Sequence, residues 1–105
     1  MKVVIYKQDR INYILDGLCD YYGITRDELN KPVRKLPQKA LRKKIATHLL
    51  WYVADCKLKD IAIALGYSDK MLYHFGDMRD EIGEMLESDK SFKTEYSQIL
   101  KHLNL

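Results

Sequence analysis

Residues 58–75 have the sequence LKDIAIALGYSDKMLYHF, whose spacing predicts two short helices joined by a tight turn. Apolar residues recur at helical spacing from Leu58 to Leu65, and Gly66 follows where a positive φ is often needed. Ser68 can cap the second helix, because its hydroxyl accepts a hydrogen bond from an otherwise unpaired backbone N–H. This pattern is typical of a helix-turn-helix, which places its second helix in the DNA major groove.

The same spacing predicts which side chains of the second helix face the core and which face outward. We expect Leu72 and Phe75 to point into the core. The outward positions are the candidates for contacts with DNA base edges, and they are Ser68, Asp69, Lys70, Tyr73 and His74.

The whole chain predicts an all-α protein, a compact bundle of about five to six helices that contains the helix-turn-helix. A capping-box pattern at Thr25 and Glu28 begins one short helix, and Pro37 suits the first turn of the central helix. We find no repeat and no domain boundary, so residues 1–105 are expected to form one domain, with residues 1–8 extended or disordered. Helices are expected over residues 9–22, 25–30, 37–56, 58–65, 68–87 and 90–103, with a loop at 31–36.

The composition is ordinary for a globular protein, with 105 residues, 47% hydrophobic and 31% charged. The longest apolar runs are far too short to span a membrane, and the first ten residues do not form a secretory signal. We therefore expect a cytoplasmic protein without a membrane partner.

No arrangement of residues typical of catalysis is present, and no nucleotide-binding GxxxxGK[ST] loop occurs. Cys19 and Cys56 stand alone, without the spacing of a metal site, and both are expected to be buried thiols. His48 lies among apolar neighbours and is expected to be a hydrogen-bonded, half-buried histidine. The sequence predicts no enzyme, no cofactor and no metal.

The net charge of +3 is small, but its distribution is uneven. Residues 31–44 hold seven basic residues and no acid, whereas residues 77–95 hold seven acids and three basic residues. One part of the molecule should therefore attract a polyanion that the other repels. The expected phosphate contacts are Lys39, Arg42, Lys43, Lys57 and Lys59.

Together these elements resemble the C-terminal DNA-binding domain of the bacterial replication initiator DnaA, a Trp-repressor-like helix-turn-helix domain. The resemblance covers roughly residues 11–103 and implies double-stranded DNA as the partner. It rests on Tyr21-Tyr22-Gly23-Ile24-Thr25 with Leu29, on Lys43-Lys44-Ile45-Ala46, on Leu58, Ile61, Ala62, Leu65 and Gly66 with Asp69, and on Leu86-Glu87-Ser88-Asp89.

The resemblance also implies roles for single residues. A basic loop residue of that family enters the minor groove, and either Arg34 or Lys35 falls at that place. The family's phosphate-binding arginine at the start of the central helix matches Lys43. The family's major-groove signature is Gly-Gly-Arg-Asp-His-Thr-Thr-Val, where residues 66–73 are GYSDKMLY. Only the first Gly and the Asp are kept, so the resemblance leaves open whether the family's specific box sequence is recognised.

The alternative is a protein-interaction module on the same scaffold, which regulates replication without specific DNA binding. Its partner would be a replication protein, bound through Tyr67, Met71 and Tyr73 or through the acids that follow them. The lost signature favours this alternative and the basic loop opposes it. A single exposed patch of Tyr and Met side chains would favour the protein partner. The oligomeric state and the choice between replication and transcription stay open.

Overall fold

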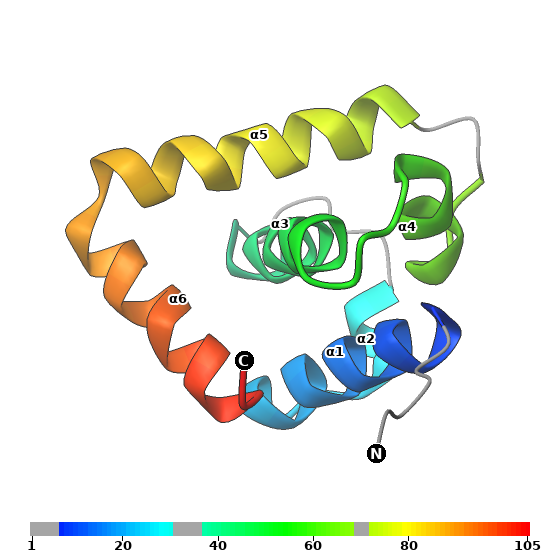
Figure 1. Cartoon of the computed structure of the whole chain (residues 1–105), viewed down its shortest axis with the longest axis horizontal. Helices are drawn as coiled ribbons and strands as arrows, with labels where there is room; N and C mark the ends of the chain where they lie inside the picture. Colours follow the sequence, from blue (N-terminus) through cyan, green and yellow to red (C-terminus); the bar gives the residue numbers. More distant parts are fainter. Residues whose placement is uncertain (1–6, 31–36, 69–71) are drawn as a thin grey trace, which may run out of the picture.

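The computed structural model describes residues 7–30, 37–68 and 72–105, and over these residues the chain is all-α, as predicted (Figure 1). The expected loop at 31–36 and the candidates at 69–71 lie outside the described residues, as do residues 1–6. Six helices within the described ranges agree with the expected number: α1 (Lys7–Tyr22), α2 (Arg26–Asn30), α3 (Pro37–Tyr52), α4 (Leu58–Ala64), α5 (Leu72–Ser88) and α6 (Lys90–His102).

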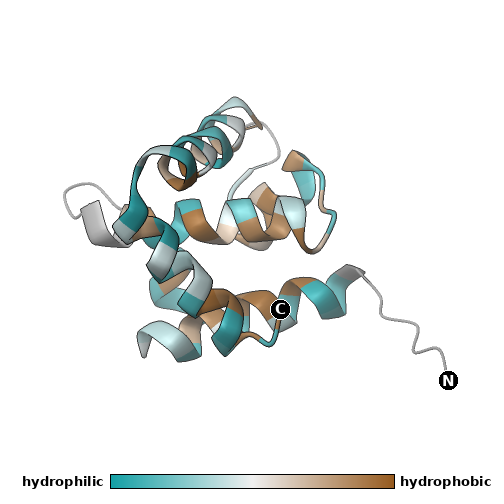
Figure 2. Cartoon of the chain, turned by 60° about the vertical axis from the view of Figure 1, so that its left-hand side comes forward, coloured by the Kyte–Doolittle hydropathy of each residue, from teal (hydrophilic) through white to brown (hydrophobic). Residues whose placement is uncertain are grey.

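Helix α3 lies at the centre of the bundle and packs against α1, α2, α4 and α5 (Figure 1). Its Ile45, Leu49 and Leu50 are fully buried. Helix α5 runs along one side of α3, α6 turns back from the end of α5, and α1 closes the other side. Apolar and hydrophilic positions alternate along the helices in Figure 2, as expected for amphipathic helices that share one core.

Helix α1 buries the apolar stripe that the sequence predicts, although it begins at Lys7 rather than at residue 9. It ends at Gly23, whose φ of 68° places it in the left-handed region. The Gly23 N–H donates to the Asp20 carbonyl (3.2 Å) and the Ile24 N–H to the Cys19 carbonyl (2.9 Å), the hydrogen bonds of a Schellman motif. The buried stripe consists of Ile11, Ile14, Leu15 and Leu18.

Helix α2 begins where the capping pattern predicts. The Thr25 hydroxyl accepts a hydrogen bond from the Glu28 N–H at 3.1 Å, which satisfies one of the backbone donors left free at a helix start. Leu29 is buried and anchors this single turn to the core.

Helix α3 is shorter than predicted, because it ends at Tyr52 and not near Cys56. The Val53 N–H still donates to the Leu49 carbonyl (2.8 Å), but Asp55 has a φ of 55° and the chain leaves the helical path. The helical spacing of residues 37–56 predicts Tyr52 and Val53 on the core side of this helix, and that prediction is wrong, because both are exposed. Cys56 is buried as expected, but it reaches the core from the loop.

Helices α5 and α6 confirm the predicted boundary between them. Asp89 is the N-cap of α6, and its carboxylate accepts a hydrogen bond from the Phe92 N–H at 3.1 Å. On α5 the buried side chains include Met78 and Ile82, as the spacing predicts. The expected core face of α6 is buried or partly buried: Phe92, Tyr96, Ile99, Leu100 and Leu103.

Both cysteines are buried thiols, as the sequence predicts. Burial raises the pKa of the Cys19 thiol, which disfavours the reactive thiolate. Neither cysteine is therefore placed for surface chemistry.

Candidate nucleic-acid interface

The turn after α4 has the geometry that Gly66 predicts. Gly66 has a φ of 83°, which a residue with a side chain rarely adopts. The Tyr67 N–H donates to the Ala62 carbonyl (2.8 Å) and the Gly66 N–H to the Ile63 carbonyl (3.0 Å), so a Schellman motif ends α4. The chain then turns towards α5, which packs against α4. Ser68 is exposed, and the cap expected from it involves residues 69–71, which lie outside the described ranges.

The first turn of α5 presents two of the predicted outward side chains. Tyr73 is 90% exposed and His74 is also exposed. Phe75 is fully buried, as predicted, and its ring meets the Tyr67 ring edge-on with 5.3 Å between centroids. This arrangement leaves a polar and aromatic surface at the start of a helix, which is the part that a recognition helix uses.

Leu72 does not point into the core, contrary to the prediction, because 37% of it is exposed. It is the first residue of α5, where Phe75 and Tyr67 already close the core. Leu72 instead lines a shallow hollow with Leu58 and Tyr73. An apolar side chain therefore lies beside the exposed tyrosine.

Lys57 and Lys59, at the start of α4, lie on the surface as expected of phosphate contacts. A Cβ placed on Gly76 would lie 3.5 Å from Leu58 Cδ1, so the start of α4 lies against the second turn of α5. The two lysines flank Leu58 in the sequence and are both exposed. Acids are also near: the Asp60 carboxylate accepts the Lys57 backbone N–H at 3.4 Å, and Asp77 and Asp80 line the same hollow as Leu58.

Lys43 does not have the position of a phosphate contact, because only 4% of the residue is exposed. Its ammonium donates to the Asn30 carbonyl at 3.1 Å and to the Tyr67 hydroxyl, and it lies 4.4 Å from the centroid of the Tyr67 ring. The charged group therefore makes its contacts inside the protein, where it links Asn30 to Tyr67. The expected role of Lys43 on DNA is corrected to an internal one.

The remaining basic candidates divide into described and undescribed residues. Arg42 is partly buried, and its guanidinium lies over the Tyr22 ring at 5.0 Å. Lys39 lies in α3, but its side chain is outside what the structure describes. The expected contacts that lie outside the described residues are Arg34, Lys35, Asp69 and Lys70.

The acids of α5 form the solvated face that the sequence predicts, and two of them hold basic residues in ion pairs. Glu81 accepts from the Lys44 ammonium at 2.6 Å. Asp80 accepts from Arg79 at 2.9 Å, while the Arg79 guanidinium lies over the Trp51 ring at 4.3 Å. The contact between Lys44 and Glu81 was not predicted, because its signal in sequence is only the presence of opposite charges on two helices.

His48 confirms the structural role expected of it. It is buried, and its Nδ1 lies 2.5 Å from the Tyr96 hydroxyl. Burial, and then the charge of Arg79, lower the pKa of His48, so the neutral imidazole is favoured in the folded protein. Burial raises the pKa of Tyr96 as well.

A single exposed patch of Tyr and Met side chains would favour a protein partner, and the two described tyrosines differ in exposure. Tyr67 is held inside by Lys43 and Phe75, whereas Tyr73 is open to solvent. Met71 lies outside the described residues. Of the two tyrosines, only Tyr73 is therefore open to a partner, because Tyr67 is partly buried and in contact with Lys43 and Phe75.

In the described parts of the chain, no group of three or more His, Cys, Asp or Glu residues could hold a metal ion. None of the helices described is long and apolar enough to cross a membrane. In comparisons with known proteins, the chain matches no family model, no curated protein and no solved structure.

Proposed function

We propose that α4 and α5 form a helix-turn-helix that binds double-stranded DNA without catalysing a reaction. The observation that carries the proposal is the exposed first turn of α5, with Tyr73 and His74 at its surface and Lys57 and Lys59 beside it. The left-handed turn at Gly66 and the sequence resemblance to the DnaA domain support the same conclusion. The resemblance further suggests a cytoplasmic protein that acts in DNA replication.

Each group of residues has its own role in this proposal. Tyr73 and His74, with Asp69 and Lys70, contact base edges in the major groove. Lys57, Lys59 and Arg42, with Lys39, contact phosphates, and Arg34 or Lys35 reaches the minor groove. Lys43 is left out because its ammonium is used inside the protein.

Fluorescence anisotropy over a salt series tests the proposal, with random duplexes and duplexes that carry the initiator box. We expect binding that weakens steeply with salt, because each neutralised phosphate releases counterions. A preference for the box would show that the family's specificity is partly kept. An absence of binding at low salt would contradict the proposal.

Tyr73→Ala should weaken DNA binding by roughly tenfold, because a base contact of this kind contributes about 1–3 kcal/mol. Tyr52→Ala is the matched control, since Tyr52 is also an exposed tyrosine (66%) but lies at the end of α3, where it stacks on His48. Equal affinities of the two variants would remove Tyr73 from the interface.

A second function, a protein-interaction module, is favoured by one observation: Leu72 and Tyr73 are neighbouring exposed apolar residues that line the same hollow. Such a pair can anchor a partner protein. If no duplex binds, the wild-type chain and Tyr73→Ala should be compared for binding to purified replication proteins. Capture that depends on Tyr73 would favour this second function.

A further inference from the structure

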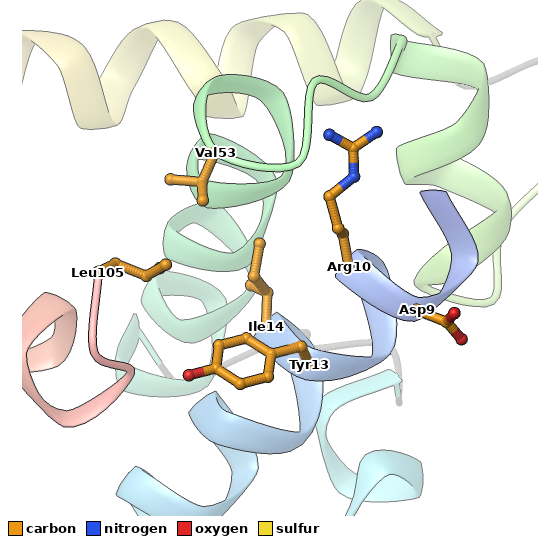
Figure 3. A pocket seen from close by; sticks show the side chains of 6 residues that line it. All are labelled: Asp9, Arg10, Tyr13, Ile14, Val53 and Leu105. Atoms are coloured by element: carbon orange, nitrogen blue, oxygen red, sulfur yellow. The ribbon is translucent and has the colours of Figure 1, made fainter. Parts of the chain in front are cut away.

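An apolar hollow of about 500 Å³ lies between α1, the end of α3 and the last residue of the chain (Figure 3). Its size is within the range of small-molecule sites. Tyr13, Val53 and Leu105, three of its walls, are among the most exposed large hydrophobic residues of the described chain. The hollow is lined by Asp9, Arg10, Tyr13, Ile14, Val53 and Leu105.

The walls of the hollow are held in place by hydrogen bonds. The Tyr13 hydroxyl donates to the Leu103 carbonyl at 2.5 Å, which fixes the ring across the gap between α1 and the end of α6. Asn104 has a φ of 58°, and the Leu105 N–H donates to the Leu100 carbonyl at 2.9 Å. The hollow is therefore largely formed before any ligand binds, which lowers the entropy cost of binding.

Arg10 is the one basic residue among the described residues that line the hollow. Its side chain extends from α1 towards the loop that follows α3, whereas Asp9 points away (Figure 3). Within the described ranges, Arg10 Nε and Arg26 Nε are both buried and lack a hydrogen-bond acceptor. What Arg10 offers a ligand in the hollow is therefore its positive charge rather than this buried donor.

We propose that this hollow binds a small aliphatic carboxylate, whose chain covers the apolar walls and whose carboxylate accepts hydrogen bonds from Arg10. A guanidinium matches a carboxylate in both charge and geometry, and the aliphatic chain of the same ligand would cover the exposed apolar walls. The site is built by α1, Val53 and Leu105, apart from the exposed turn of α5, so it does not depend on the proposed DNA binding.

The test compares octanoate with octanamide, which has the same chain but no charge, on the full chain labelled with ¹⁵N. Octanoate should shift the backbone amides of Arg10, Tyr13 and Val53 and bind about tenfold more tightly than octanamide, because a charged hydrogen bond is stronger than a neutral one. Arg10→Met keeps the apolar stem and should abolish the difference between the two ligands. Arg26→Met should keep that difference, since Arg26 pairs with Asp16 at 2.8 Å and does not line the hollow.

Val53→Asp is a second variant at an exposed position, and it should abolish binding of both ligands by placing a charge on the apolar wall. Equal affinity for octanoate and octanamide in the wild-type chain would overturn the proposal. Shifts elsewhere in the chain, or none at all, would do the same. Unchanged octanoate affinity in Arg10→Met would also overturn it.

Discussion

Lys43 shows how one buried charge can change the meaning of a basic run. In the sequence it is one of the seven basic residues in the stretch 31–44, which holds no acid. The arginine that matches it in the DnaA family binds phosphate. In the structure its ammonium is enclosed by the Asn30 carbonyl and the Tyr67 hydroxyl and ring. A buried ammonium needs such partners because its desolvation is costly. Lys43 therefore stabilises the two segments on which the proposed DNA contacts depend.

Lys43→Met should lower the free energy of unfolding by about 1–3 kcal/mol, because it removes the hydrogen bonds from the Lys43 ammonium to the Asn30 carbonyl and the Tyr67 hydroxyl. Urea denaturation measures the loss, and Lys59→Met, at an exposed position, should change stability by less than about 0.5 kcal/mol. The slope of DNA affinity against salt should be the same in Lys43→Met as in the wild-type chain. A slope reduced by about one would instead show that Lys43 contacts a phosphate.

His48 is a second buried polar residue, and its lowered pKa has a consequence for stability. In the unfolded chain the imidazole titrates near its ordinary value of 6.5, whereas burial and Arg79 oppose protonation in the folded protein. Below about pH 6.5 the unfolded state therefore binds more protons, and the free energy of unfolding must fall as the pH falls.

Thermal melting from pH 8 to pH 5 should show this loss in the wild-type chain. His48→Gln should be less stable than the wild type at pH 8, because the hydrogen bond with Tyr96 is altered. The stability gap between the two proteins should narrow as the pH falls below about 6.5, because only the wild type loses the contribution of a neutral His48. A gap that stays constant from pH 8 to pH 5 would contradict the assignment.

At the scale of helices, the starts and ends were predicted where a local signal exists. Gly23 and Gly66 end their helices with positive φ, and Thr25 and Asp89 cap the helices that follow. The end of α3 was not predicted, because neither glycine nor proline marks it. There Asp55, a residue that can adopt positive φ, makes the turn.

The contact between α1 and α6 depends on Gly17. A Cβ on Gly17 would lie 1.9 Å from Leu103 Cδ2, and Leu103 is buried, whereas a Cβ on Gly83 in α5 would meet no atom within 4 Å. Both Gly→Ala changes improve helix propensity by a similar amount. Gly17→Ala should therefore be less stable than Gly83→Ala by about 1–3 kcal/mol, the cost of overpacking.

Urea denaturation of the two glycine variants side by side measures this difference directly. Equal stabilities would mean that α6 moves away from α1 at no cost. In that case the close approach at Gly17 would not matter for the fold.

At the scale of the molecule, acids as well as lysines lie near the proposed interface, since Asp77 and Asp80 line the hollow beside Tyr73. The exposed lysines at the start of α4 lie beside the first turns of α5, while the far end of α5 leads into α6 (Figure 1). The acids of α5 hold Lys44 and Arg79, so not every basic residue is available to a ligand. The position of the free charges, more than the net charge of +3, should orient DNA.

Replacing Lys57 and Lys59 together by Gln should weaken binding to all duplexes alike and lower the salt slope by about two, one for each lost phosphate contact. Replacing Lys93 and Lys101 of α6 by Gln changes the net charge equally and should leave the slope unchanged. Anisotropy over the same salt series separates the two pairs. Equal slopes for both double variants would place the DNA elsewhere.

The sequence by itself determined the all-α class, the apolar stripes of α1, α5 and α6, and the turn at Gly66. These features depend on helical spacing and on caps, which involve residues within a few positions of one another. Only the tertiary structure decided four other features. They are the hydrogen bond from Lys43 to Tyr67, the ion pair of Lys44 with Glu81, the exposure of Leu72 and the hollow beside Arg10. The partners in these contacts come from separate helices or lie at helix ends, and no local pattern records which distant residues the folded chain brings together.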